Sequence, residues 1–459
     1  MQTLADTILQ EDIQTILFLL NSGEPIDQLD EYGFTPLIEA AIVDNIDIVK
    51  LLLEYHADPN QQDTTGGTAL HWAAENNNLA LCELLLKSHA NPNAVTFAGQ
   101  PVLVMPLLRR QQSITKLLYQ YGADQLFTQD FINTKLLGHV FELVGTANIV
   151  NPSHQFVEVD FEGFFIEVTL ALIANSLYQF QHHFAARTLR HYAGLTYPTI
   201  EALQRASEII KYQQYRVDIR QHREKINTLL QKEPLIIPIG YEGHAITFIK
   251  QDNIIVKCDR REESRLYDNV MFYRITQPEK MHVPFIMNLI YEKQSGQFIN
   301  EELLHVLGLQ PFTDLKIEAQ ISGNCSWANV EACIPAIFLL LLIQADPQDK
   351  LLAHYKTLAL KFFHHWRSWN KNRALKFCIQ TFKETNTIRK ACKAEVLAAI
   401  LFQHANTLDK ESILAILELF IHSPYEYILR NYLHTYYYNN PTEEGKYFAE
   451  LLKMYDYLK

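Results

Sequence analysis

Hydrophobic positions in the first part of the chain recur with a period of 33 residues. The segment Gly33–Ala41 aligns with Gly66–Ala74 at this offset, and alanines at positions 57, 90 and 123 mark the same place in three successive copies. A second apolar run follows in each full copy, at Ile48–Leu53 and at Leu81–Leu86. A period of about 20 to 50 residues indicates stacked units that bury one continuous core. The pattern therefore predicts a solenoid of short helix pairs.

Two of these copies carry the residue types that start a first helix, Thr35–Ala41 and Thr68–Ala74. Their threonines can cap the helix, and their paired alanines let the helices approach closely. Both segments resemble the TPLHxAA start of the ankyrin repeat. The resemblance implies about four repeats, of which the outer copies at Leu17–Gly23 and Gln100–Leu107 are degraded, and a surface that binds a protein partner. The other interpretation is that the repeats only brace the domain that follows.

Patterning changes after the repeats. A mixed, mainly helical stretch is followed by segments rich in β-branched and aromatic residues, at Leu235–Gly240, on both sides of 252–253 and at Val270–Ile275, which predicts strands. From Cys325 onward apolar residues recur at helical spacing almost to the end. We predict an α+β chain with an ankyrin array over residues 1–125, a cysteine protease-like domain over 126–345, and a helical C-terminal region over 346–459 that packs on the helix beginning at Cys325.

Composition narrows the class of protein. With 48% hydrophobic residues, the chain can bury several cores, and its net charge of −12 argues against non-specific nucleic-acid binding. Six cysteines without a CxxC pair indicate a reducing compartment. We expect no signal peptide and no membrane span, since the longest apolar run, Ile334–Ile343, is shorter than the roughly 18 residues that a spanning helix needs.

A candidate nucleophile lies at the start of the predicted long helix. Gln320 precedes Cys325 by five residues, and Gly323 allows a tight turn between them. A thiolate at a helix N-terminus is stabilised by unpaired backbone N–H groups and by the positive end of the helix dipole. Acyl transfer also needs donors for an oxyanion, and we assign that role to the side chain of Gln320 and the backbone N–H of Cys325.

The general base is expected in the predicted hairpin. If residues 252–253 form its turn, residues whose numbers sum to 503–505 face each other, so that Asp259 to Arg261 lie opposite His244. Opposed residues on antiparallel strands have Cβ atoms about 5 Å apart, within reach of a carboxylate and an imidazole. We predict that Asp259 orients His244 and that His244 activates Cys325.

The order His244, Asp259, Gln320, Cys325 resembles the permuted papain-like arrangement of ubiquitin-like-protein proteases and of related bacterial effector acyltransferases. The resemblance covers roughly residues 235 to 345. It implies a cysteine hydrolase that cleaves a peptide or isopeptide bond, or transfers an acyl group, without a metal or another cofactor. The glutamine lies five residues before the cysteine, where those families more often have six, and no tryptophan follows His244. These departures leave the substrate class open.

With an ankyrin array in front, the chain is similar to the ankyrin-repeat effectors of Legionella. This resemblance implies type IV secretion into a host cell, action in the cytosol or nucleus, and a host protein as partner of the array. Two hypotheses follow: a cysteine hydrolase that acts on a recruited protein substrate, or a non-catalytic adaptor with a protease-like fold. Deamidation would use the same residues, and a lipid- or partner-binding role for Tyr425–Tyr438 is a third hypothesis.

The other cysteines and the histidine pairs are interpreted as structural. Cysteines at 82, 258, 333, 378 and 392 stand outside the glutamine and helix-start context of Cys325, and a buried cysteine in an apolar segment usually only packs. The pairs at 182–183 and 364–365 lack the i,i+4 spacing of a helical zinc site. We interpret Trp327 as a core anchor. Packing also remains the alternative role for Cys325 and His244.

Overall fold

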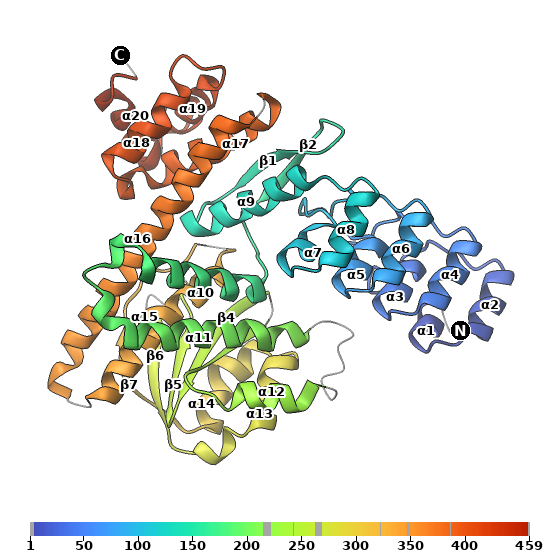
Figure 1. The fold of residues 1–459 in the computed structure, drawn as a ribbon, viewed down its shortest axis with the longest axis horizontal. Helices are drawn as coiled ribbons and strands as arrows, with labels where there is room; N and C mark the ends of the chain where they lie inside the picture. Colours follow the sequence, from blue (N-terminus) through green and yellow to red (C-terminus); the bar gives the residue numbers. More distant parts are fainter. Residues whose placement is uncertain are drawn as a thin grey trace. The chain divides into compact units, whose positions relative to one another are not determined.

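The computed structural model describes residues 4–213, 222–241, 243–261, 269–321, 323–346, 349–385 and 387–457. These residues divide into two compact units. The first contains the chain up to residue 135 together with residues 146–160, and the second contains residues 136–145 and the described residues from 161 onward. Figure 1 follows the chain through its helices and strands.

The first unit begins with the ankyrin array that the repeat predicted. Its helices pair as α1 with α2, α3 with α4, α5 with α6 and α7 with α8. The apolar faces of these pairs join in one core that runs through the whole array. The bounds are α1 Leu4–Leu9, α2 Ile13–Asn21, α3 Pro36–Ile42, α4 Ile46–Glu54, α5 Ala69–Glu75, α6 Leu79–Lys87, α7 Val104–Leu108 and α8 Gln112–Gln120.

Backbone conformation repeats with the same period as the sequence. Gly33, Gly66 and Gly99 have φ angles of 84°, 83° and 76°, a conformation that glycine adopts without strain. Asn60 and Asn93, also 33 residues apart, donate from Nδ2 to a carbonyl group of the following repeat at 3.1 and 2.9 Å. Side-chain hydrogen bonds therefore link each repeat to the next, in addition to the shared core.

The degraded fourth repeat shows what the lost threonine does. Thr35 caps α3 by accepting the N–H of Ile38 at 3.2 Å. Proline stands at position 101, which corresponds to Thr35 and Thr68 in the 33-residue period. Relative to this period, helix α7 begins two residues later than α3 and α5, its N-cap residue Leu103 makes no capping hydrogen bond, and it has five residues where α3 and α5 have seven. Without a capping oxygen, the first N–H groups of a helix lose a partner, so the helix is shorter.

A long helix and a hairpin follow the array. Helix α9, Gln125–Phe141, begins in the first unit and ends in the second. Strands β1, Thr146–Val150, and β2, Phe156–Asp160, form an antiparallel hairpin that belongs to the first unit. Gly99 of the fourth repeat lies directly against β2, where a Cβ atom would come within 2.6 Å of a backbone oxygen. The hairpin therefore covers the end of the repeats.

The second unit is built on a five-stranded antiparallel sheet. The strand order β3-β4-β5-β6-β7 pairs each strand with its neighbours in the sequence. The sequence predicted the first four of these strands but not β7. The bounds are β3 Leu235–Tyr241, β4 His244–Gln251, β5 Ile254–Cys258, β6 Val270–Ile275 and β7 Leu309–Leu315.

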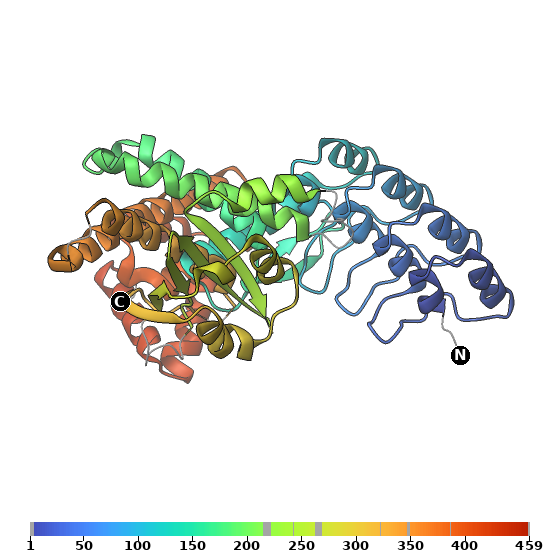
Figure 2. The same ribbon diagram turned by 90° about the horizontal axis from the view of Figure 1, so that it is seen from below.

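Helices cover this sheet. Helix α15, Cys325–Ala345, packs against β4 and β5, α11 packs against β3 and α15, and α10 packs against α11 and α15. Figure 2 shows these helices beside the strands from a second direction. Helix α13 packs against β3. The bounds are α10 Ile166–His182, α11 Ala193–Ile210, α12 Arg223–Leu230, α13 Val283–Tyr291 and α14 Leu303–Val306.

Helix α15 is longer than the uninterrupted apolar run Ile334–Ile343 that marked it. It has 21 residues and a window of mean hydropathy 1.8, enough by length and composition to cross a membrane. From the sequence, no segment was expected to be long enough to span a membrane, because only uninterrupted apolar residues were counted. By length and mean hydropathy, α15 does reach that limit. However, 83% of the window is buried inside the protein. A buried core helix has the same composition, so this is weak evidence for a membrane span.

The C-terminal region is helical. Helix α16, Leu352–Glu384, starts beside α15, where Phe362 stacks on Phe338 with ring centroids 4.8 Å apart. It then continues to contact α17 and α18, which Figure 1 shows in orange and red. The remaining bounds are α17 Thr387–His404, α18 Lys410–Phe420, α19 Glu426–Leu433 and α20 Glu443–Met454.

Candidate functional site

Three residues predicted for a thiol site lie at the ends of neighbouring elements. His244 is the first residue of β4, Asp259 follows the last residue of β5, and Cys325 is the first residue of α15. Nε2 of His244 lies 3.0 Å from Oδ1 of Asp259, and the Cys325 thiol is near enough to the His244 side chain for each to shift the pKa of the other. Because the carboxylate occupies Nε2, Nδ1 is the ring nitrogen left for the thiol.

Strands β4 and β5 separate where these residues lie. Their ladder ends at the pair Thr247 and Cys258, whose numbers sum to 505, within the range expected for this hairpin. Continued pairing would place Ala245 opposite Arg260. Instead, the N–H of Ala245 points to Sγ of Cys325 at 3.4 Å. The first turn of α15 thus takes the place of a strand partner, and the thiol accepts a backbone hydrogen bond.

Asn329, one turn into α15, connects the two strand ends that no longer pair with each other. Its Nδ2 donates to the carbonyl of Ala245 at 2.6 Å, and its Oδ1 accepts the N–H of Arg260 at 2.8 Å. An asparagine side chain has the same donor and acceptor as a peptide group, so it can bridge two separated strands. Since Ala245 and Arg260 follow His244 and Asp259 directly, this one amide, 1% exposed, ties both strands to the helix.

The contacts shift the ionisation of all three groups. Burial alone would lower the pKa of His244, but hydrogen bonds to Asp259 and Cys325 raise it above its usual value. Burial alone would raise the pKa of the Cys325 thiol, but His244 and the N–H of Ala245 lower it overall. Burial also opposes ionisation of Asp259, yet His244 and two neighbouring cations hold the pKa of Asp259 well below its usual range. The shifts favour a thiolate beside an imidazolium.

Gln320, the predicted oxyanion donor, lies in the segment before α15. Its backbone N–H donates to the carbonyl of Arg260 at 2.7 Å, so this segment lies beside the residue that follows Asp259. The Gln320 side chain is 9% exposed, and its Oε1 has no hydrogen-bond partner among the residues that the structure describes, which exclude Ser322. Buried polar atoms without a structural partner are uncommon and call for an explanation.

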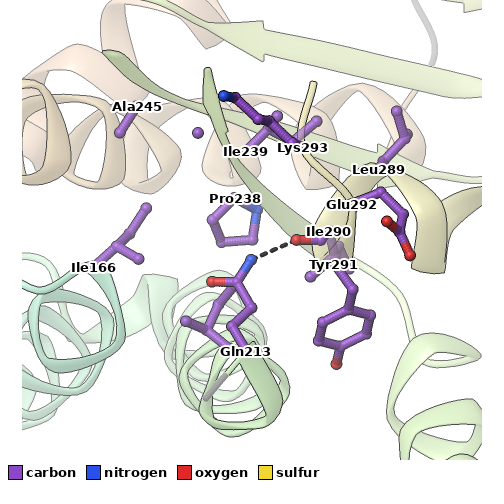
Figure 3. A pocket seen from close by; sticks show the side chains of 12 residues that line it. Ile166, Gln213, Pro238, Ile239, Ala245, Leu289, Ile290, Tyr291, Glu292 and Lys293 are labelled. Atoms are coloured by element: carbon purple, nitrogen blue, oxygen red, sulfur yellow. Dashed lines mark hydrogen bonds between the residues drawn. The ribbon is translucent and has the colours of Figure 1, made fainter. Parts of the chain in front are cut away.

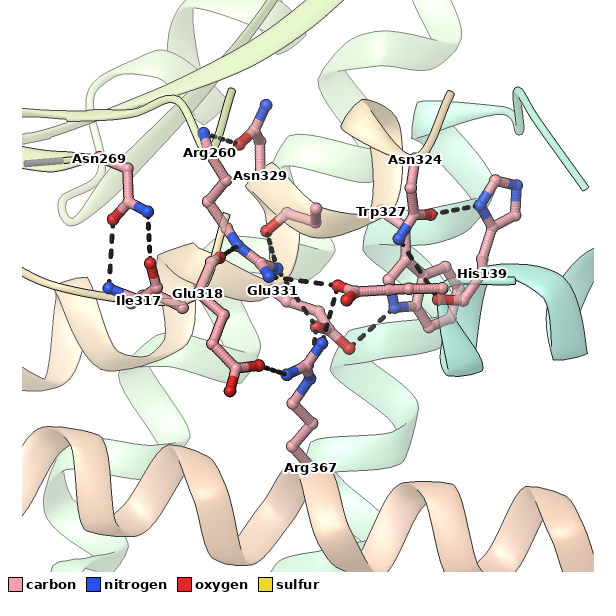
Figure 4. A network of polar contacts seen from close by, with 12 residues as sticks. His139, Arg260, Asn269, Ile317, Glu318, Asn324, Trp327, Asn329, Glu331 and Arg367 are labelled. Atoms are coloured by element: carbon pink, nitrogen blue, oxygen red, sulfur yellow. Dashed lines mark hydrogen bonds and ion pairs between the residues drawn. The ribbon is translucent and has the colours of Figure 1, made fainter. Parts of the chain in front are cut away.

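A buried ion network includes Arg260, the residue that follows Asp259 (Figure 4). Arg260, which is fully buried, lies 3.2 Å from Glu142 and 3.8 Å from Glu331. Arg367 of α16 approaches the same two carboxylates at 2.7 and 3.4 Å. Burial raises the pKa of Glu142, but the two arginines outweigh it and lower that pKa overall. The network joins the residue after Asp259 to α15 and α16.

A second polar cluster orients the start of α15. Asn324, the N-cap residue, has Oδ1 2.5 Å from Nδ1 of His139. Trp327 stacks on the His139 ring with centroids 6.2 Å apart and donates from Nε1 to Glu331 at 2.8 Å. Trp327 is 3% exposed, as expected of a core anchor. The cluster holds the first turn of α15, which carries Cys325, in place.

A cavity of about 340 Å³ opens beside the site. Its lining includes Pro238, Gly240 and Ala245, together with residues of α10, α11 and α13 (Figure 3). Gly240 pairs with Ala245 across the β3–β4 ladder, and no atom lies within 4 Å of the position that a Gly240 Cβ would take. Two small residues thus keep the cavity open next to His244, which precedes Ala245.

The remaining cysteines and histidines show no comparable arrangement. All six cysteines lie among the described residues, and Cys325 alone is not buried. Burial raises the pKa of Cys82 and of Cys378 to about 12 and that of Cys258 well above its usual value. Within the described ranges, no group of three histidine, cysteine or acidic side chains is placed to hold a metal ion.

Comparison with known proteins gives two matches. The family model of ankyrin repeats in three copies matches residues 4–96 and 55–129. The solved structure of the Legionella effector AnkH is 39% identical in sequence, and the match covers 98% of this chain and 97% of that chain with a TM-score of 0.82. The chain belongs to the AnkH family. Comparison with curated proteins found no match.

In this AnkH-family chain, sequence reasoning missed two parts of the site. One is the backbone N–H of Ala245, since a main-chain group leaves no signal in the sequence. The other is Asn329, whose signal was visible as a polar residue four positions after Cys325 in an apolar helix. The structure brings His244, Asp259 and Cys325 into contact and places the Gln320 segment beside them.

Proposed function

We propose that this protein is a host-acting effector with a papain-like thiol hydrolase site. The contact of His244 with both Asp259 and Cys325 carries the proposal, because a base oriented by a third group is what activates a thiol for attack on a carbonyl carbon. The similarity to a Legionella effector supports action in a host cell. The substrate is a peptide or isopeptide bond of a host protein that the ankyrin array helps to recruit.

The reaction has two halves. The Cys325 thiolate attacks the carbonyl carbon, and the oxyanion is held by the N–H of Cys325 and the amide of Gln320. The His244 imidazolium then gives its proton to the amine as the C–N bond breaks, which leaves a thioester. Water attacks the thioester, His244 takes the proton of that water, and Cys325 leaves as a thiolate. Asp259 keeps the ring oriented and stabilises the imidazolium. An amine in place of water gives acyl transfer, and a glutamine side chain as substrate gives deamidation.

The second candidate function is a non-catalytic adaptor. The ankyrin array favours it, because such arrays usually present a surface to a protein partner and do no chemistry. The two functions differ in their dependence on the thiol. The adaptor predicts that Cys325→Ala keeps the full cellular effect, whereas the hydrolase predicts that this substitution abolishes it.

The pH dependence of Cys325 alkylation tests the hydrolase. Peptide mass spectrometry follows all six cysteines in the parent and in His244→Ala, so that the five buried cysteines serve as internal controls. We expect Cys325 to react with an inflection below the ordinary thiol pKa of about 8.5. In His244→Ala the inflection moves above that value, because burial then dominates, and the rate at pH 7 falls at least about tenfold. Equal inflections in both proteins would refute the activated pair.

A further inference from the structure

Two segments of this acidic chain contain no acidic residue. Aspartate and glutamate make up 52 of 459 residues, about one in nine, yet none occurs at positions 168–200 or 350–383. At the average frequency these two segments together would carry between seven and eight acidic residues. They carry lysine, arginine and histidine instead. The fold brings them together, because α10 and α16 pack against each other.

A cavity of about 430 Å³ lies where the two segments meet. Ligand sites have volumes of about 300 to 1,000 Å³. The first segment contributes Phe180 and His183 to the lining, and α16 contributes Trp369, Arg373 and Lys376. Among the residues that the structure describes, no acidic residue lines this cavity, and none of the lining residues belongs to the thiol site. Aromatic and cationic groups are therefore combined in one wall.

Arg373 has uncharged partners. Its guanidinium donates to Oε1 of Gln179 and, at 3.2 Å, to Oδ1 of Asn370. Partial desolvation lowers the pKa of Arg373, and no carboxylate among the described residues offsets this. Arg367, six residues earlier on the same helix, is by contrast paired with Glu142 at 2.7 Å. A cation whose surroundings supply no countercharge gains most from an anionic ligand.

The aromatic groups gather around Trp369. The Trp369 ring has the Phe180 ring at 5.4 Å, the His183 ring at 5.5 Å and the guanidinium carbon of Arg373 at 5.0 Å. Nδ1 of His183 accepts a backbone N–H at 3.0 Å, so the neutral ring carries its proton on Nε2 and can donate from there. Flat heterocycles stack on such aromatic and guanidinium planes, and arginine binds phosphate through paired donors.

We propose that this cavity binds a nucleoside phosphate. The base lies against Trp369 and His183, and the phosphate pairs with Arg373 and Lys376. A bare anion would gain nothing from the aromatic wall, and a neutral ring would gain nothing from the cations, so a ligand that carries both groups fits best. The site does not depend on the thiol chemistry, and its occupancy can be measured without a known substrate.

Calorimetric titration of the full-length protein with AMP, adenosine and inorganic phosphate tests the proposal. We expect AMP to bind at least about tenfold more tightly than adenosine or phosphate, since only AMP uses both halves of the site. Arg373→Gln should weaken AMP binding about tenfold through loss of a charge-assisted contact. The control Lys361→Gln makes the same charge change on the same helix outside the cavity, and should leave AMP affinity within about twofold.

Three results would overturn the proposal. They are no binding of AMP at millimolar concentration, phosphate that binds as tightly as AMP, and an equal loss of AMP affinity in Arg373→Gln and Lys361→Gln. Trp369→Leu probes the aromatic half and should weaken both AMP and adenosine. Arg373 lies at the surface, so Arg373→Gln keeps the test decisive if Trp369→Leu fails to fold, and circular dichroism establishes folding for each variant.

Discussion

Replacing Asn329 with alanine tests whether an amide of α15 ties together the separated ends of β4 and β5 at the thiol site. The side chain makes two buried hydrogen bonds, to the carbonyl of Ala245 at 2.6 Å and from the N–H of Arg260 at 2.8 Å. The substitution leaves both backbone groups without a partner, and each unsatisfied buried group costs about 1–3 kcal/mol. We expect Asn329→Ala to lower the free energy of unfolding by about 3–4 kcal/mol.

The same substitution should change the thiol. His244 and the N–H of Ala245 both lower the pKa of Cys325, and both depend on the position of β4. Once the bridge is lost, we expect the alkylation inflection of Cys325 to rise by about one pH unit, which corresponds to about 1.4 kcal/mol of lost thiolate stabilisation. Denaturant unfolding measures the first effect, and alkylation of the folded variant across pH measures the second.

Asn370→Ala is the matched control. It removes another buried asparagine, whose Oδ1 accepts the hydroxyl of Ser176 at 2.6 Å in a hydrogen bond between α16 and α10. It should destabilise the protein without moving the Cys325 inflection. An Asn329→Ala protein as stable as the parent would refute the structural part of the reasoning. A destabilised Asn329→Ala protein with the parental inflection would refute the positioning role.

Three other substitutions test the buried charges and the cavity beside the thiol. Burial raises the pKa of Glu39 to about 7, so ionisation of Glu39 destabilises the array as pH rises. Glu39→Gln should therefore stabilise the array by about 2 kcal/mol more at pH 8 than at pH 5. Hydrogen exchange measures this, and a gain in protection that is the same at both pH values would contradict the prediction. Glu142→Gln removes the carboxylate nearest to the two buried arginines and should cost about 3–5 kcal/mol in denaturant unfolding. Glu318→Gln, whose side chain is 78% exposed, should cost about 0–1 kcal/mol, and equal costs would contradict a special contribution of the buried carboxylate. Gly240→Leu adds an apolar side chain to the cavity lining at a position where a Cβ meets no atom within 4 Å. It should slow labelling of Cys325 by a peptidyl reagent with a large apolar side chain at least about tenfold, while iodoacetamide reacts as before; equal slowing of both reagents would contradict a role of the cavity in substrate binding.

The ankyrin array and the hairpin could be predicted because their physics is local. A threonine that caps its own helix and a glycine in a tight turn act within a few residues, and the 33-residue period repeats the signal. The ankyrin prediction is confirmed by the family model. The register of β4 and β5 was equally accessible, because the short turn that contains Asp252, with a φ angle of 48°, sets which residues face each other.

Strand β7 could not be predicted from its own residues. Gln310 and Pro311 interrupt the apolar alternation, and proline cannot donate to a strand partner. The structure accommodates Pro311 because β7 is the edge strand and the β6–β7 register shifts at Phe272 and Tyr273. The strand therefore forms because β6, more than 30 residues earlier, offers it an edge.

The sequence by itself determined which chemical groups the protein has and where each stands on its element: a thiol at a helix start, and an imidazole and a carboxylate on adjacent strands. Only the tertiary structure decided how these groups ionise. The pKa of Cys325 depends on a balance between burial, which raises it, and hydrogen bonds from His244 and Ala245, 80 residues earlier, which lower it. Both contributions arise only when α15 enters between β4 and β5 and Asn329 holds it there, because no local pattern records which distant backbone a helix will meet.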